Sequence, residues 1–149
     1  MPHPPRPPSL TALPSYLASY VAGHGRQYLE DELARRGLKL AHNAVLTALV
    51  DFGPAAQQDL AESLRIDKSH LVKHIDLLEA RGWLRRESDP DDRRRHRINL
   101  TTTGRRQARD LQRVAQQSQR DFLRSLDSAE QATLIELLTR VLADNDSRA

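Results

Sequence analysis

Apolar residues recur every three or four positions in the first third of the chain, which is the spacing of one face of a helix. The stripe comprises Leu13, Leu17, Tyr20, Val21, His24, Tyr28, Leu29 and Leu33. It predicts a helix from Ser9 or Ser15 to about Arg36. Gly23 and Gly25 weaken this helix, since each glycine costs about 1 kcal/mol relative to alanine in a helix interior.

The next pattern predicts a helix-turn-helix. Apolar positions indicate a helix over residues 41–51 that stops at Gly53-Pro54, and then two short helices over residues 57–64 and 68–81. Three residues separate the two short helices, as in a helix-turn-helix. Asp67 is a natural N-cap for the second, and Gly82 lies where a left-handed residue ends a helix.

A β-hairpin with a basic tip follows. Asp89-Pro90-Asp91 is turn chemistry, because proline fixes φ and aspartate side chains bond nearby backbone groups. Ile98 and Leu100 alternate with polar residues, as in a half-buried strand. Thr101 offers a hydroxyl cap to the next helix. Residues 86–104 therefore predict a hairpin that carries arginines out to a polyanion.

Two more helices are expected at the C-terminal end. The first is marked by Ala108, Leu111, Val114, Ala115, Phe122 and Leu126, and the second by Leu134, Ile135, Leu137, Leu138, Val141 and Leu142. Asp127 and Glu130 form a capping-box pattern that opens the second. These broad apolar faces predict a homodimer, because a small winged module cannot cover them. The alternative is an intramolecular helical bundle.

Composition narrows the function classes. The 149-residue chain has no cysteine, which excludes disulfides, thiolate catalysis and cysteine-based zinc sites. Five prolines among the first eight residues predict a disordered tail over residues 1–9. No apolar run approaches the roughly 18 residues that span a bilayer, so we expect a cytoplasmic protein without membrane contact. The sequence also shows no nucleophile with a paired base and no phosphate-binding glycine loop, so we expect neither an enzyme nor a cofactor.

Positive charge is concentrated in one third of the chain. Residues 65–113 hold 14 Arg or Lys against eight Asp or Glu, although the whole chain carries only +3. Such basic patches bind phosphate backbones. The alternative is a solvated charged face.

The basic third supplies candidate DNA contacts from two elements. The predicted second short helix presents Lys68, Ser69, His70, Lys73 and His74 on its early, outward side. A helix fits the major groove of DNA, and a basic loop reaches the adjacent minor groove. These five residues and the hairpin arginines are therefore candidates for double-stranded DNA binding.

From about Leu10 to Leu142 the chain resembles the MarR family of bacterial winged-helix transcriptional regulators. The motif that carries the resemblance is Asp92-x-Arg94, Ile98-x-Leu100-Thr101 and Gly104, preceded by Leu78-Glu79-x-Arg81-Gly82-Trp83-Leu84-x-Arg86. The resemblance implies that Arg94 enters the minor groove, that Asp92 holds it, and that Arg86 steadies the same carboxylate. Arg93 and Arg95 are further phosphate contacts or solvated neighbours. The resemblance also implies a homodimer joined by its first and last helices.

The same resemblance implies a small aromatic or anionic effector, bound between the dimer helices and the DNA-binding lobe. Tyr20, His24 and His42 are the candidate residues for that site, and satisfied core histidines are the alternative. His70 and His74 lie four residues apart, as zinc ligands can, but no further ligand can be placed beside them, so we expect no metal. The chain departs from the family at Lys39-Leu40-Ala41, which lacks the usual threonine before the helix predicted over residues 41–51.

These patterns predict a mainly α fold with a small β-hairpin wing. Residues 41–104 form a winged helix-turn-helix lobe, and residues 10–40 and 105–145 form dimerisation helices within a single domain over 10–149. The expected function is a homodimeric repressor of a pseudo-palindromic operator, released by an effector. The alternative is a winged-helix module that binds protein without DNA, for which a neutral or acidic wing would be expected.

Overall fold

The computed structural model describes residues 3–149 and shows a mainly helical chain with one small sheet. The helices are α1 (Pro8–Thr11), α2 (Pro14–Ala34), α3 (Leu40–Phe52), α4 (Gln57–Leu64), α5 (Lys68–Ala80), α6 (Thr102–Phe122) and α7 (Ser128–Asp146). The strands are β1 (Ala55–Ala56), β2 (Leu84–Ser88) and β3 (His96–Leu100). The predicted fold class is confirmed.

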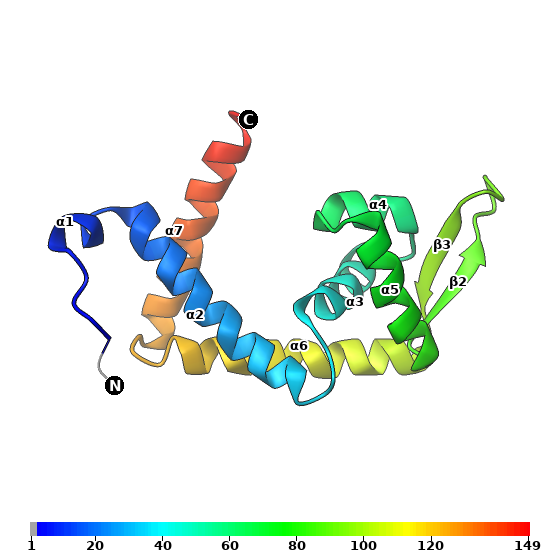
Figure 1. Ribbon diagram of the computed structural model, residues 1–149, viewed down its shortest axis with the longest axis horizontal. Coiled ribbons are helices and arrows are strands. Elements are labelled where there is room, and N and C mark those ends of the chain that lie inside the picture. The colour runs from blue at the N-terminus through cyan, green and yellow to red at the C-terminus, as the bar shows by residue number, and fades with distance from the viewer. Residues whose placement is uncertain (1–2) are drawn as a thin grey trace.

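Helix α6 runs along the length of the molecule and joins its two ends (Figure 1). At one end, α2 crosses its C-terminal half, α1 lies beyond the start of α2, and α7 projects away from the end of α6 (Figure 1). At the other, α3, α4, α5 and the β2–β3 hairpin form a lobe over its N-terminal half (Figure 1). The hairpin extends alongside α5 and away from α6, so the wing and the helix-turn-helix lie in one lobe.

The local signals for helix ends are confirmed. The carboxylate of Asp67 accepts hydrogen bonds from the N–H groups of Ser69 and His70, and the hydroxyl of Thr101 accepts from Gly104. Asp127 and Glu130 exchange the two bonds of a capping box. Gly82 ends α5 with φ of 72°, in the left-handed region.

The predicted N-terminal tail is wrong for Pro8 and Ser9, which begin α1. Proline is favoured in the first turn of a helix, because the N–H that it lacks would have no partner there. Pro14 likewise occupies the first position of α2, so a new helix begins there after α1 has ended. Arg6 lies over the ring of Tyr20 at 4.7 Å, so this part of the tail contacts α2. Residues 1 and 2 lie outside the described residues.

The sheet has three antiparallel strands in the order β1-β3-β2. Leu84 pairs with Leu100 and Arg86 with Ile98 across the hairpin, while the two-residue β1 pairs Ala55 with Ile98. The sequence pattern did not predict β1, because two alanines carry no periodicity. This strand ties the start of α4 to the wing.

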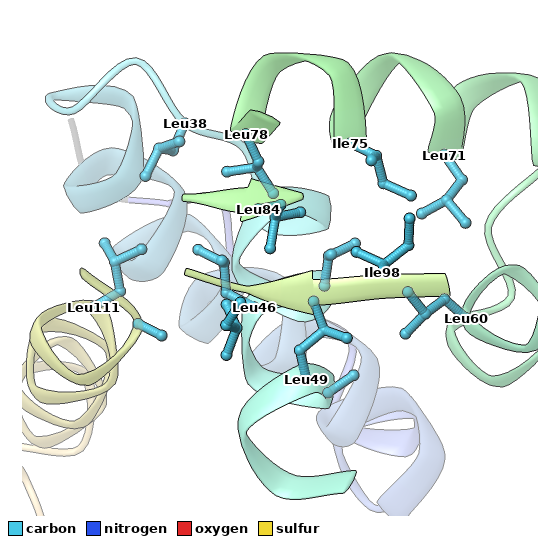
Figure 2. Packing of buried hydrophobic residues seen from close by; sticks show 14 of the residues in the cluster. Leu38, Leu46, Leu49, Leu60, Leu71, Ile75, Leu78, Leu84, Ile98 and Leu111 are labelled. Carbon is cyan, nitrogen blue, oxygen red and sulfur yellow. The ribbon is translucent and has the colours of Figure 1, made fainter. Parts of the chain in front are cut away.

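One hydrophobic core holds the lobe together. Ile75 and Leu78 of α5, Leu46 of α3 and Ile98 of β3 are among its fully buried side chains, and they converge between the helices and the sheet (Figure 2). Leu33 of α2 and Leu111 of α6 belong to the same core. Trp83 is half-buried at the margin of this core, with the Arg81 guanidinium 5.2 Å from its ring centroid.

Two glycines allow close approaches that the helices require. A Cβ atom on Gly25 would lie 2.9 Å from the ring of Phe122, so the glycine that weakens α2 locally lets α2 cross α6. A Cβ atom on Gly104 would lie only 1.9 Å from the carbonyl oxygen of Trp83. Gly104 therefore allows the first turn of α6 to pack against the segment between α5 and β2.

Candidate nucleic-acid interface

The first two turns of α5 present an exposed polar edge. Lys68, Ser69, His70 and Lys73 are all exposed. Hydrogen bonds from the hydroxyl and N–H of Ser69, and from the N–H of His70, lower the pKa of Asp67 and keep its carboxylate charged. The cap thus fixes the backbone at the start of the helix that the sequence assigned to base reading.

His74 departs from the predicted outward-facing set. Its Nδ1 lies 3.1 Å from Nε2 of His42, and the two rings meet edge to face with centroids 4.7 Å apart. His74 is half-buried, because α3 lies beside this part of α5. Its ring therefore links α5 to α3.

His42 is a satisfied core histidine, which was the alternative interpretation of this residue. It is buried, and its Nδ1 accepts a hydrogen bond of 2.8 Å from the N–H of Lys39. This bond satisfies an N–H at the start of α3, where the usual threonine is missing. Burial, and then repulsion by His74 when it is protonated, by Arg81 and by Lys39, lowers the pKa of His42 to about 4.

The wing tip is shaped by aspartates. Asp92 accepts a hydrogen bond of 3.0 Å from the backbone N–H of Arg94, and Asp89 accepts one of 2.9 Å from Asp91. Arg93 and Arg94 are exposed at this turn. Arg95 forms an ion pair of 2.9 Å with Asp59 on α4, which braces the tip against the helix-turn-helix.

The expected contact between Arg86 and Asp92 is wrong. The Arg86 guanidinium lies 2.6 Å from Asp76 and 2.8 Å from Glu79, both on α5. The reason is the register of β2, which packs beside α5 and places Arg86 opposite these carboxylates. Arg86 is thus held against α5.

Gln57 and Gln58, which sequence reasoning missed, open α4 and line two small hollows. One is shared with Lys68 of α5, and the other, of about 180 Å³, is shared with Arg94 and Arg95 of the wing. Two adjacent glutamines at the start of the helix predicted over residues 57–64 were the sequence signal that could have identified them. The ion pairs of Asp59, Asp76 and Glu79 were also missed, because their partners lie on other elements.

The residues predicted to hold an effector do not share one place. Tyr20 and His24 line a hollow on α2 that also includes His3 and Gly23. His42 is buried behind His74, and His74 itself borders an open groove of about 710 Å³ between the end of α2 and the start of α5. The structure therefore separates Tyr20 and His24 from His42.

Within residues 3–149, no His, Asp and Glu side chains form a group of three that could hold a metal ion. In the same part of the chain, no helix is both long and apolar enough to span a membrane.

A helix-turn-helix whose second helix has an exposed polar edge, followed by a hairpin with an arginine-rich tip, defines a winged-helix DNA-binding protein. The MarR family model matches residues 38–96. An uncharacterised HTH-type transcriptional regulator of Bacillus subtilis, YxaD, is 31% identical over 115 residues, which cover 76% of this chain and 80% of YxaD. The chain belongs to the MarR family of transcriptional regulators, which are DNA-binding proteins without enzymatic activity.

Other relatives carry more specific names. The putative transcriptional regulatory protein for the hcr operon of Thauera aromatica is 28% identical, over 78% of this chain and 70% of that protein. The transcriptional repressor NicR of Pseudomonas putida is 29% identical, over 70% of this chain and 65% of NicR.

Solved structures share the whole fold. Wild-type MarR from E. coli superposes with a TM-score of 0.79 at 25% identity, covering 87% of this chain and 96% of MarR. A cysteine-to-serine mutant of MarR in complex with operator DNA gives a TM-score of 0.71 at 26% identity, over 92% and 99%. Bordetella bronchiseptica BpsR, whose DNA binding is regulated by 6-hydroxynicotinic acid, gives 0.74 at 25% identity, over 91% and 97%.

Proposed function

We propose that the protein is a homodimeric repressor that binds a pseudo-palindromic operator. The observation that carries the dimer is the exposed apolar surface of the terminal helices. Ile135, Val141 and Leu142 of α7 are each more than 60% exposed, and none of the residues of α7, all of which are described, is buried. Leu17 and Val21 of α2, and Leu13 just before it, are also exposed. A second copy that covers these faces would remove this apolar surface from water.

In this proposal α5 enters the major groove and the wing the minor groove. Lys68, Ser69, His70 and Lys73 supply the contacts from α5, and their exposure on one edge supports this assignment. Arg93 and Arg94 supply the wing contacts, since the negative potential of a narrow minor groove attracts arginine. Arg95, which pairs with Asp59, also contacts DNA phosphates. Two related lobes then read half-sites roughly 10 bp apart.

We further propose that a small aromatic or anionic effector binds the groove of about 710 Å³. Lys39, Arg65 and His70 border it and would attract a carboxylate, while Leu38 and Ile66 would pack against a ring. The effect of 6-hydroxynicotinic acid on BpsR supports an effector of this class. NicR, named as a repressor, supports the sign of regulation.

The proposal is tested first by mass and then by DNA binding. Sedimentation should give a dimer, and the double variant Val141→Glu with Leu142→Glu should give a folded monomer, because neither side chain is buried in the chain. Arg140→Ala, at the position immediately before them and also exposed, is the control and should remain dimeric. A wild-type protein that is monomeric at micromolar concentration would count against the dimer.

Selection of bound fragments from genomic DNA then identifies the operator. We expect an inverted repeat that overlaps a promoter, and weaker binding when 6-hydroxynicotinic acid or benzoate is added. Enrichment of sites without twofold symmetry would contradict the operator part of the proposal. Sites that lie only upstream of promoters and raise transcription would contradict repression.

A further inference from the structure

Arg86 is the most highly connected side chain of the DNA-binding lobe. Its guanidinium contacts the carboxylates of Asp76 and Glu79, which lie three residues apart on the same side of α5. It also reaches Gln57 at the start of α4 and the carbonyl oxygen of Val72, both at 3.5 Å. The backbone N–H of Arg86 donates to Glu79 at 3.0 Å. One residue of β2 thus joins the sheet to both helices of the helix-turn-helix.

These contacts occupy the fork of the guanidinium. Arginine presents five N–H donors in a fixed plane, and here both terminal nitrogens face carboxylates while Nε faces Gln57. The Arg86 side chain is 20% exposed, against 57% for its neighbour Arg85. Little of the group remains available to a phosphate.

The two elements that Arg86 joins must act together on DNA. The edge that includes Ser69 and Lys73 lies on α5, and Arg94 lies at the far end of the hairpin that β2 begins. Adjacent major and minor grooves have a fixed separation, so the helix and the wing tip must be held at a matching separation. The hairpin extends alongside α5 (Figure 1), and Arg86 lies on the strand that faces it.

We propose that Arg86 is a positioning residue that sets the wing against the recognition helix and does not itself contact DNA. This inference rests on the proposed contacts of α5 and the wing. In this proposal Asp76 and Glu79 hold Arg86 in place. Their negative charges also make the lobe less positive, which by itself weakens its attraction to DNA. Affinity for the operator then depends on the ion pairs of Arg86 with Asp76 and Glu79, although the two carboxylates repel DNA phosphates.

The double variant Asp76→Asn with Glu79→Gln tests this most sharply, because it frees Arg86 and removes two negative charges. The test duplex is one selected with the wild-type protein. If Arg86 positions the wing, binding to this duplex should weaken about tenfold even though the net charge becomes more positive, since residues in one ion-pair network are energetically coupled. If Arg86 instead binds phosphate, freeing it should leave the affinity unchanged or raise it, and either result overturns the proposal.

Arg86→Gln provides a second readout in the salt dependence. On arbitrary duplex, where binding depends on phosphate contacts and not on a fixed fit to the grooves, a lost phosphate contact lowers the slope of log K against log salt by about 0.9, whereas a lost positioning residue removes no contact of its own. We expect an unchanged slope and a reduced preference for the selected duplex over arbitrary DNA. A slope lower by about one overturns the proposal. If Arg86→Gln does not fold, as judged by circular dichroism, the carboxylate variant decides.

Two controls separate geometry from charge. Arg85→Gln removes the same charge from the neighbouring position of β2, where the side chain pairs with Glu87, and should leave the preference for the selected duplex within about twofold. Arg86→Lys keeps the charge but cannot span both carboxylates, so it should recover only part of the preference. Full recovery would overturn the positioning role of the fork. If the wild-type protein selects no duplex at all, the proposed function fails first.

Discussion

Nε2 of His42 lies 3.1 Å from Nδ1 of His74, and this contact joins α3 to α5. Because Nδ1 of His42 accepts from the N–H of Lys39, the proton of His42 lies on Nε2 and is donated to His74. This hydrogen bond fits the neutral forms of both rings, because Nε2 of His42 donates and Nδ1 of His74 accepts. A proton added to Nδ1 of either ring would break one of the two bonds.

This arrangement predicts acid sensitivity. The pKa of His42 is about 4 in the folded protein, below the value of 6.5 that the unfolded chain presents, so folding favours the neutral ring. Its contribution to stability is complete above pH 6.5 and is lost as the pH falls towards 4, by up to about 3 kcal/mol. The fall should be measured by urea denaturation between pH 7 and 4.

His42→Gln should flatten that part of the pH profile, at the cost of lower stability at pH 7. His24→Gln, at an exposed position of α2, is the matched control and should keep the wild-type profile. An identical profile in His42→Gln would show that other groups cause the acid sensitivity.

Arg94→Ala should weaken DNA binding without changing the fold. We expect a loss of about 1–3 kcal/mol and a salt slope lower by about one, because the side chain is exposed at the wing tip and a single phosphate or groove contact is removed. Fluorescence anisotropy at several salt concentrations gives both quantities. Arg140→Ala on α7 removes the same charge outside the lobe and should bind as the wild type. Unaltered affinity in Arg94→Ala would refute the wing contact.

His70→Ala and Lys73→Ala distinguish base reading from backbone contact. If these side chains read base edges, each should reduce affinity for the selected operator more than affinity for arbitrary duplex. Both are exposed, so the melting temperature should change little. Competition assays with the two kinds of duplex measure the difference. Equal losses on both would assign the two residues to phosphates.

Gly104→Ala should be strongly destabilising, because the new Cβ atom would lie 1.9 Å from the carbonyl oxygen of Trp83 and the backbone itself would have to move. We expect a loss of at least about 3 kcal/mol in the free energy of unfolding. Gly23→Ala is the opposite case, since no atom lies within 4 Å of its Cβ position in α2. It should raise stability by about 1 kcal/mol. Thermal melts of the two variants that shift in the same direction would contradict this packing.

Features that depend on neighbouring residues could be predicted from the sequence alone. The bounds of α4 and the start of α5, the cap at Asp67, the left-handed Gly82 and the capping box at Asp127 all follow from periodicity and from hydrogen bonds within a few residues. The wing was recognisable for the same reason, since its turn chemistry is local. The small strand β1 was not, because it exists only through its pairing with β3.

The positions of the exposed site residues follow from the local sequence. The partners of the less exposed residues are set by the tertiary structure. Sequence placed Ser69, His70 and Arg94 on a helix edge and a wing tip, and the structure exposes them there. It could not tell that Arg86 turns to α5, that Arg95 meets Asp59 36 residues away, or that His74 meets His42 32 residues away. Partners so distant in the chain are selected by how helices and strands pack, and no local pattern carries that information.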